Sequence, residues 1–421
     1  MRLEFIAVGS ELLDGRILNS NQKTIGNLLR QYGLKLRYTQ SVGDSEGDLA
    51  EVFETAAKRS DWVLVSGGLG PTQDDLSLKA FCEWSSLPYL YSEKIENMIR
   101  NRLESIGSQF RDLHKNQAYC PENSTLLANE NGTAPGIDLR YKETRFTFLP
   151  GIPVEMKGIL ENLFEKEFQE QSTKKRKTWS TVFSSESFLE EKLSTLYSEF
   201  QGKAEISYQT SFPYNFISLN YDEKNETNLE NIFQKVTALL EKKTISISSE
   251  NTSLEKVLLR QSIENSEALF TVESCTGGLI AHLLTNCSGS SAAYEGSLLS
   301  YSNQMKKELG VEASLLEKCG AVSEEVLKSL LRSAQGAAEK LALNKKKYQG
   351  IKILATTGIA GPSGGSEEKP VGSAYVGVLS KSFTEKEATL KIEKVPHMKN
   401  RDRLFYKNYF ANRALYLALG G

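Results

Sequence analysis

Short apolar runs alternate with amphipathic segments along the first 170 residues of the chain. Compact runs rich in Val, Leu, Ile and Phe predict strands at residues 3–8, 34–42, 62–65 and 145–149. Apolar residues spaced three and four positions apart predict helices at residues 21–32, 47–58 and 154–168. Strands that alternate with helices in this way are typical of an α/β sheet with crossover helices.

The pattern changes after residue 168. Residues 169–177 are polar and end in four consecutive basic residues, which indicates a linker. Residues 178–249 are serine-rich and β-like, with helical periodicity near residues 188–200 and 229–241. This stretch predicts a small α+β module.

Residues 250–421 return to an alternation of strands and helices. Strands are predicted at residues 268–272, 351–355 and 374–379, and helices at residues 254–263, 323–343 and from about 401 onward. The expected fold class is therefore a multidomain α/β protein, with domains at residues 1–170, 178–249 and 250–421.

Composition narrows the function classes. Lys and Arg number 51 and Asp and Glu number 53, so the formal charge of −2 argues against bulk electrostatic binding to nucleic acid or membrane surfaces. No apolar run approaches the roughly 18 residues that a spanning helix needs. The five cysteines are scattered and the chain has three histidines, which argues against a zinc site and favours reduced thiols in the cytoplasm.

A first candidate site follows the strand predicted at 62–65. Gly67, Gly68 and Gly70 permit the backbone conformations of an anion-binding nest. Asp74 and Asp75 come next, and paired carboxylates commonly hold Mg²⁺ against substrate phosphates. An ordinary strand-to-helix turn with an acidic first turn would look the same, so the spacing alone leaves both interpretations open.

Further loops can complete this site. Residues 9–15 form a glycine loop after the first predicted strand, and residues 131–136 and 150–156 are also turn-like. Loops that follow parallel strands meet at one edge of an open α/β sheet, where ligands bind. Each loop, taken alone, is also compatible with a simple turn.

A second candidate site lies in the third region. Its polar loops are residues 273–278, 288–291, 301–306 and 356–365. None of the three histidines flanks their serines, which argues against a Ser-His-Asp hydrolase. A desolvated lysine can replace histidine as the base, so Lys306 is a candidate to accept a serine proton, directly or through Tyr301. A serine-rich loop beside a solvated lysine is an equally ordinary interpretation of this spacing.

The motifs of the first region, GSELLDG, SGGLGPTQDD, NGTAPG and PGIPVEM, resemble the N-terminal domain of the CinA (competence/damage-inducible protein) family. The resemblance implies a molybdopterin-binding-like α/β sandwich with ADP-ribose pyrophosphatase activity, which yields AMP and ribose 5-phosphate. It further implies that a divalent metal such as Mg²⁺ is handled by Asp74 and Asp75 together with Glu11, and that the pyrophosphate is bound near Gly67, Gly68, Gly70 and Thr72.

The motifs ESCTGG, SGSSAAYEG, YSNQMK, TTGIAGPSGG and KPVG resemble the C-terminal CinA domain, the nicotinamide-nucleotide amidase family. The resemblance implies hydrolysis of nicotinamide mononucleotide (NMN) to nicotinate mononucleotide and ammonia, without a cofactor. It assigns Ser291 as the nucleophile, Lys306 as the base and Tyr301 as its hydrogen-bonding partner. The implied substrate-binding residues are Glu273, Ser274, Thr276, Gly277, Thr357, Gly358, Gly361 and Arg401.

The middle region resembles the KH-like module of the same family only weakly. It contains no GXXG loop with which a KH domain clamps RNA, so a spacer that positions the other domains is expected and a nucleic-acid partner is not. The sequence does not specify the oligomeric state, and a homodimer is the working expectation. The leading hypothesis is a bifunctional enzyme of pyridine-nucleotide salvage, and the alternatives are a molybdopterin-precursor binder or a non-catalytic regulatory or scaffold protein of competence and DNA repair.

Overall fold

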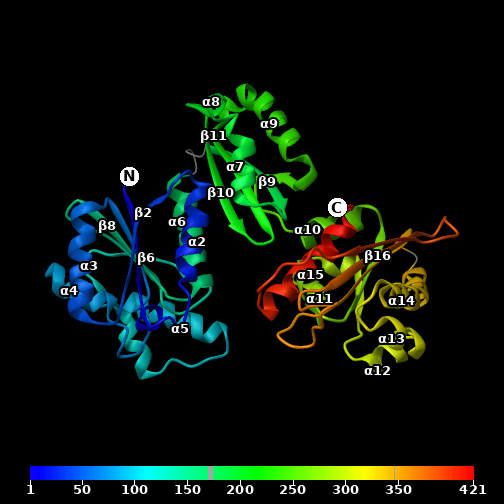
Figure 1. Ribbon diagram of the computed structural model, residues 1–421. Coiled ribbons are helices and arrows are strands. Elements are labelled where there is room, and N and C mark those ends of the chain that lie inside the picture. Colours follow the sequence, from blue (N-terminus) through cyan, green and yellow to red (C-terminus); the bar gives the residue numbers. More distant parts are fainter. Residues whose placement is uncertain (169–173, 346) are drawn as a thin grey trace. The chain divides into compact units, whose positions relative to one another are not determined.

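The computed structural model describes residues 1–168, 174–345 and 347–421. These residues form two compact units, Met1–Lys174 and Lys175–Gly421 (Figure 1). No helix in the described part of the chain is both long and apolar enough to span a bilayer. Each unit is built around its own α/β sheet, and the second also carries the sheet of the middle region.

The first unit contains a six-stranded sheet in which four parallel strands are followed by two antiparallel ones. In sheet order the strands are β2 (Leu36–Val42), β1 (Leu3–Val8), β3 (Trp62–Ser66), β8 (Thr144–Leu149), β7 (Gly136–Tyr141) and β6 (Thr125–Leu127). The four predicted strands are confirmed to within two residues. Their side chains point alternately into two hydrophobic cores, one on each face of the sheet.

Helices cover both faces of this sheet (Figure 1). One face carries α2 (Ser20–Gln31) and α6 (Pro153–Phe168), and the other carries α3 (Glu46–Arg59), α4 (Ser77–Ser85) and α5 (Glu93–Ser105). The predicted helices correspond to α2, α3 and α6. The remaining elements are the short helix α1 (Ser10–Leu13), the pair β4 (Tyr89–Tyr91) and β5 (Tyr119–Pro121), and the 3₁₀ segment Asp112–Ala118.

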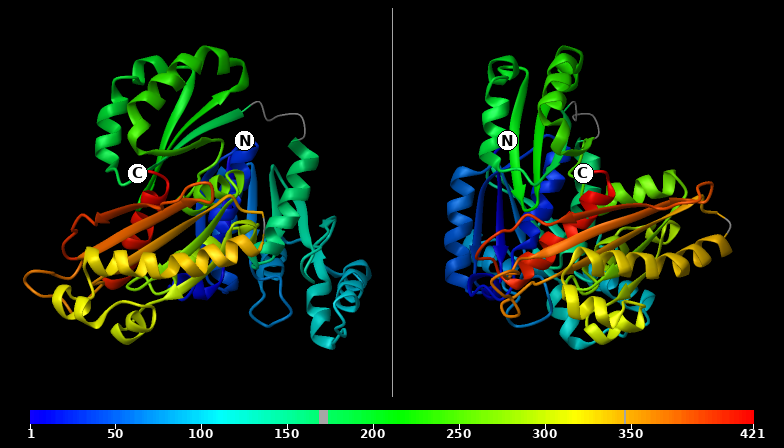
Figure 2. Two further views of the ribbon diagram at one scale, coloured as in Figure 1. Left: turned by 90° about the vertical axis from the view of Figure 1, so that its right-hand side faces the viewer. Right: turned by 45° about the vertical axis from the view of Figure 1, so that its right-hand side comes forward.

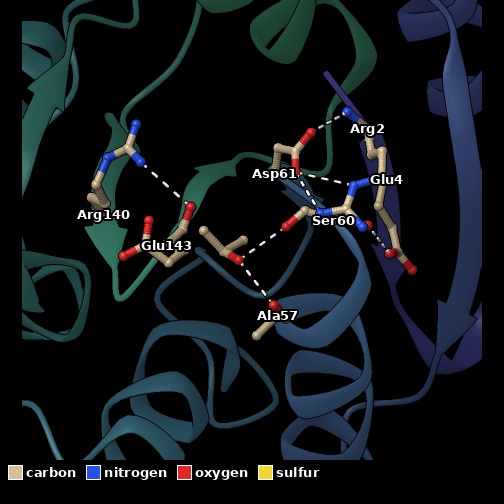
Figure 3. A network of polar contacts seen from close by, with 8 residues as sticks. Arg2, Glu4, Ala57, Ser60, Asp61, Arg140 and Glu143 are labelled. Carbon is tan, nitrogen blue, oxygen red and sulfur yellow. Dashed lines mark hydrogen bonds and ion pairs between the residues drawn. The ribbon is translucent and has the colours of Figure 1, made fainter.

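A buried carboxylate anchors the amino ends of the central strands. Glu4 of β1 is fully buried and accepts hydrogen bonds from Ser60 (2.6 Å), Gln40 (2.8 Å) and Arg59 (3.0 Å). Figure 3 shows Ser60 beside Asp61, whose carboxylate pairs with Arg2 at the surface. Polar groups therefore stabilise this edge of the sheet, opposite the edge where the candidate site lies.

The middle region forms a four-stranded sheet in the order β10 (Ala204–Ser211), β11 (Tyr214–Asp222), β9 (Lys174–Val182) and β12 (Thr244–Ser248). Its helices are α7 (Glu186–Ser194), α8 (Tyr197–Phe200) and α9 (Glu226–Leu240). The linker expected at 169–177 is wrong at its end, because residues 174–177 begin β9. Lys175 forms ion pairs with Glu223 and Glu226, which ties this basic segment to the module. Residues 169–173 lie outside the described residues.

The C-terminal region contains a five-stranded sheet in the order β14 (Tyr294–Leu299), β13 (Glu267–Glu273), β15 (Gly350–Gly358), β16 (Ala374–Ser382) and β17 (Thr389–Lys394). The first three strands are parallel and the last two antiparallel. The long helix α14 (Glu324–Asn344) runs along one face, as Figure 2 shows. The other face packs on α10 (Leu254–Glu264), α11 (Leu279–Thr285) and α15 (Arg403–Ala418). Two short helices, α12 (Asn303–Glu308) and α13 (Ala313–Cys319), follow β14.

Candidate active sites

The second unit gathers its polar loops at one edge of the C-terminal sheet. The parallel strands β13, β14 and β15 end at Glu273, Leu299 and Gly358, and these ends lie at the same edge. Ser300 N donates to Glu273 O at 2.8 Å and Ser274 N donates to Thr356 O at 3.2 Å, so the loops begin in register. This is the edge at which open α/β sheets bind ligands.

Lys306 is a buried amine at this edge. It lies on α12, which begins after Ser302, whose side chain accepts a hydrogen bond from Met305 N at 3.0 Å. Only 2% of Lys306 is exposed. Its Nζ lies 3.0 Å from Ser274 Oγ and 2.6 Å from the carbonyl oxygen of Ser300. Burial lowers the pKa of Lys306, because the charged form loses the water that would otherwise surround it.

Ser274 is held toward this amine by the turn after β13. Ser274 is 6% exposed. The preceding Glu273 is fully buried and accepts hydrogen bonds from Ile280 N (3.1 Å) and Ala281 N (2.8 Å) at the start of α11. Gly277 and Gly278 adopt φ values of 60° and 89°, which allow the chain to reverse between strand and helix. Glu273 is therefore a structural residue of the turn, and Ser274 is the hydroxyl beside the amine.

The predicted pairing of Ser291 with Lys306 is wrong. Ser291 is exposed and precedes β14, whereas Lys306 follows it. Ala293 O accepts a hydrogen bond from Leu269 N near the amino end of β13, so Ser291 lies at the opposite edge of the sheet. Six strand residues span roughly 20 Å, which is far beyond the reach of a proton transfer.

The predicted roles of Tyr301 and Arg401 also need correction. Tyr301 is 62% exposed, and Lys306 Nζ reaches its carbonyl oxygen at 3.4 Å instead of its phenol. The phenol oxygen accepts a hydrogen bond of 2.9 Å from Arg403, which also donates to the Gly361 carbonyl. Arg401 lies 5.1 Å above the ring of Phe405. Arg403 is therefore the arginine that contacts the predicted site residues.

Thr276 and Thr357, both predicted to bind substrate, form hydrogen bonds within the protein at this edge of the C-terminal sheet. Thr276 Oγ lies 2.8 Å from the Thr356 hydroxyl, and Thr357 Oγ donates to the Ala321 carbonyl at 2.7 Å. Gly358 has no room for a side chain, because a Cβ there would lie 2.6 Å from the Cβ of Ala374 and 3.1 Å from Cys275 Sγ. Burial raises the pKa of Cys275 to about 12, so this neighbour of Ser274 remains a neutral thiol.

The sequence interpretation missed Lys407. Its Nζ lies 3.6 Å from the position that a Cβ on Gly277 would occupy, directly beside the loop that carries Ser274. Lys407 is one helical turn from Arg403 on α15, and this i,i+4 spacing was a signal for a shared face. His282, the histidine nearest in sequence to Ser274, is exposed and contacts Asn286 at 2.9 Å on α11.

The first unit has a pocket at the corresponding edge of its own sheet. Gly67 and Gly68 follow β3 with φ values of 111° and 67°. A Cβ on Gly67 would lie 2.3 Å from Val8 O, and one on Gly68 would lie 2.3 Å from Ser77 Oγ. Only glycine allows the loop to pack this closely. The pocket beside it is lined by Gly68, Leu69, Gly70, Asp75, Leu78, Tyr89, Asn116, Gln117, Tyr119, Ala134, Pro135 and Ile137.

Of the three acidic residues predicted for this site, only Asp75 lines the pocket. Asp75 lines it and accepts hydrogen bonds from Thr72 N (2.8 Å) and Thr72 Oγ (2.6 Å). Asp74 is exposed, and Glu11 folds back so that a Cβ on Gly9 would lie 2.7 Å from its carboxylate. Among the described residues, no three His, Cys, Asp or Glu side chains are grouped to hold a metal. Asp75 is the predicted carboxylate that lines the pocket, so it is the residue that would hold a divalent metal there, with water and substrate phosphates as the further ligands.

Comparison with known proteins finds a matching family model for each of the two ends of the chain. Residues 251–418 match the family model described as "CinA C-terminal domain", and residues 4–170 match the model described as "Probable molybdopterin binding domain". A crystal structure titled as the protein CinA from Thermoplasma acidophilum is 31% identical and covers 40% of this chain and 99% of its own, with a TM-score of 0.37.

Full-length relatives cover nearly the whole chain. A protein of Caldicellulosiruptor saccharolyticus, whose name places it among the competence-damage inducible proteins, is 35% identical over 396 residues, covering 91% of this chain and 92% of its own. A CinA-like protein of Cytophaga hutchinsonii is 33% identical over 399 residues, covering 93% and 92%. With both domain models matched and relatives of this extent, the chain belongs to the CinA family.

Proposed function

We propose that the C-terminal site hydrolyses the carboxamide of NMN, with Ser274 as the nucleophile and Lys306 as its base. The observation that carries this proposal is the 3.0 Å contact between Lys306 Nζ and Ser274 Oγ in a buried setting at the ligand-binding edge of the sheet. A serine hydroxyl is a weak nucleophile until a neighbouring base takes its proton, and a lysine with a lowered pKa can do so.

The reaction proceeds in two stages, formation of an acyl-serine and its hydrolysis. Ser274 Oγ attacks the carboxamide carbon while its proton passes to the neutral amine of Lys306. Lys306 then returns that proton to the leaving nitrogen, the C–N bond breaks, and ammonia departs from an acyl-serine. Water hydrolyses the acyl-serine with Lys306 again as the base, which yields nicotinate mononucleotide and restores the hydroxyl.

The cations of α15 support a phosphorylated substrate. Arg403 contacts the loop that contains Gly361, and Lys407 lies beside Gly277 in the loop of Ser274, so two positive side chains lie beside the polar loops of this sheet edge. Arginine and lysine are common partners of phosphate groups. We assign these two residues, in place of Arg401, to the phosphate of the mononucleotide.

The decisive experiment compares two serines. Purified Ser274→Ala should release no ammonia from NMN above background, whereas Ser291→Ala should retain normal turnover because Ser291 lies at the other sheet edge. Circular dichroism should show both variants folded. Normal turnover by Ser274→Ala would overturn the proposed nucleophile.

For the first unit we propose cleavage of ADP-ribose to AMP and ribose 5-phosphate. The supporting observation is a pocket that combines the Gly68–Gly70 backbone with the carboxylate of Asp75. Main-chain amides can bind a pyrophosphate, and a divalent metal at Asp75 would stabilise the charge of the leaving phosphate when bound. Asp75 orients the loop through Thr72 and presents a carboxylate to the pocket.

This second activity has its own test. AMP formation from ADP-ribose should stop on addition of EDTA and fall strongly in Asp75→Asn, while the exposed Asp74→Asn should change it less. Binding of ADP-ribose without turnover, measured by calorimetry in the presence of Mg²⁺, would instead favour a ligand sensor. Tight binding of a molybdopterin precursor alone would favour the binder alternative.

A further inference from the structure

The hairpin of the middle module packs on helix α15 of the C-terminal region. Phe212 lies in the turn between β10 and β11, and its ring stacks on that of Phe405 with centroids 4.7 Å apart and planes at 25°. The same ring lies 5.8 Å from that of Tyr409. Stacked and tilted aromatic pairs at these distances stabilise packing by more than the burial of their apolar area alone provides.

Two further side chains of the middle module reach the same helix. Phe183, just after β9, has its ring 5.9 Å from that of Tyr409 and 5.5 Å from that of Tyr416. Tyr214 OH donates to Asn412 Oδ1 at 3.0 Å and accepts from Leu254 N at 3.2 Å. Asn412 is buried, so this hydrogen bond is shielded from water.

These contacts occupy one face of α15. Residues 405, 409, 412 and 416 recur at the spacing of a single helical stripe and contact the middle module. Arg403 and Lys407 are one turn apart on a different stripe, where they contact Tyr301 and the Gly277 loop. The helix therefore links the middle module to the loops around Ser274.

We propose that Phe183, Phe212 and Tyr214 of the middle module are positioning residues for the amidase. They fix the rotation of α15 about its axis and its position along that axis, so that Arg403 and Lys407 can bind the phosphate of the substrate. The proposal rests on the amidase function proposed above. It makes residues 175–421 the working amidase unit and gives the module a role in substrate affinity that a passive spacer would not have.

A matched pair of variants in the full-length chain tests this role. Phe212→Ala removes the ring that stacks on α15, and Phe188→Ala removes an equally exposed ring (both 44%) on α7 of the same module. Phe212→Ala should raise KM for NMN roughly three- to tenfold, the factor expected for a lost aromatic pair, with kcat within about twofold. Phe188→Ala should match the wild type, and Phe212→Tyr should restore KM.

A second readout does not depend on the chemistry. Hydrogen exchange at the amides of residues 403–409 should be faster in Phe212→Ala than in the wild type. Unchanged exchange there, or an equal rise of KM in Phe188→Ala, would overturn the positioning role even if the amidase is active. If wild-type protein does not hydrolyse NMN, the proposed function fails and the exchange experiment still decides whether the module holds α15. Should Phe212→Ala not fold, Tyr214→Phe, which removes only the hydroxyl, provides the same comparison.

Discussion

Lys306 is an amine whose surroundings change its proton affinity. Burial lowers its pKa from 10.5, so the neutral form is more abundant near neutral pH than in a solvated lysine. In the proposed mechanism only the neutral amine can accept the proton of Ser274, so kcat/KM for NMN should rise with pH through the pKa of Lys306. Lys306→Arg should reduce kcat at least 100-fold, roughly the usual scale of a lost general base. A pH–rate profile that is flat from pH 6 to about 9.5 would contradict this assignment.

The same lysine makes stability depend on pH. Between its lowered folded-state pKa and 10.5, the unfolded chain binds more protons at this position than the folded chain. The free energy of unfolding should therefore rise with pH across that window. Lys306→Met should remove this part of the slope and leave the second unit at least as stable near neutral pH, measured by thermal unfolding at several pH values.

Glu4 offers a contrasting case in the first unit, at the amino ends of its central strands. Burial alone would raise its pKa, but hydrogen bonds from Arg59, Ser60 and Gln40 outweigh that effect and lower it. Glu4 should thus stabilise the first unit above pH 4.5, and this contribution should be lost as the pH falls. Glu4→Gln should lower the free energy of unfolding by about 1–3 kcal/mol at pH 7. Asp61→Asn, which affects the exposed pair with Arg2, should have a much smaller effect.

At the scale of elements, substitution of a glycine by alanine should have opposite effects on stability at two positions, Gly68 in the loop after β3 and Gly47 on α3. Gly68→Ala should destabilise the first unit by about 1–3 kcal/mol, because φ is positive and the new Cβ would meet Ser77 Oγ. Gly47→Ala, on the exposed side of α3 with no atom within 4 Å of the new Cβ, should instead stabilise the unit by about 0.4–1 kcal/mol. Urea unfolding of the two variants tests this difference. Equal effects would mean that the loop relaxes around the methyl group added at Gly68.

Prediction from the sequence worked best for buried strands and long amphipathic helices. The strands at 3–8 and 268–272 were found because apolar runs, interrupted only by Glu4 and Thr271, reflect burial on both faces. The edge strands β6 and β17 were missed, because β6 has only three residues and β17 carries only two apolar residues, Leu390 and Ile392, among polar ones. The linker at 174–177 was wrong because a basic run can also lie in a strand whose charges pair with acids, as Lys175 does.

The error over Ser291 has a geometric cause. A serine-rich loop and a lysine lay close in sequence, but a parallel strand between them separates them in space. Ser274 directly follows the strand predicted at 268–272, and the rule that parallel strands end at one edge would have favoured it over Ser291. The sequence left open whether Lys306 is desolvated or solvated, and the structure buries it, whereas the contacts of Tyr301 and Arg403 depend on side-chain directions that spacing does not specify.

At the scale of the whole molecule, the division at Lys174 and Lys175 predicts separable units. Fragments 1–174 and 175–421 should each fold, and their thermal transitions should match those of the full chain. A fragment of residues 250–421 should be less stable than 175–421, because Val182 and Phe183 belong to the core that α15 completes. Calorimetry of the three fragments decides this. Identical transitions for 250–421 and 175–421 would show that the module adds nothing to that core.

The depth of the Ser274–Lys306 pair has a consequence for inhibition. General acylating reagents attack serines from bulk water, and Ser274, which is only 6% exposed, offers them little surface. A phosphate-bearing molecule that first engages the cations of α15 would deliver its electrophilic carbon from within the protein. Warheads attached to a nucleotide should thus label this protein far faster than the same warheads alone.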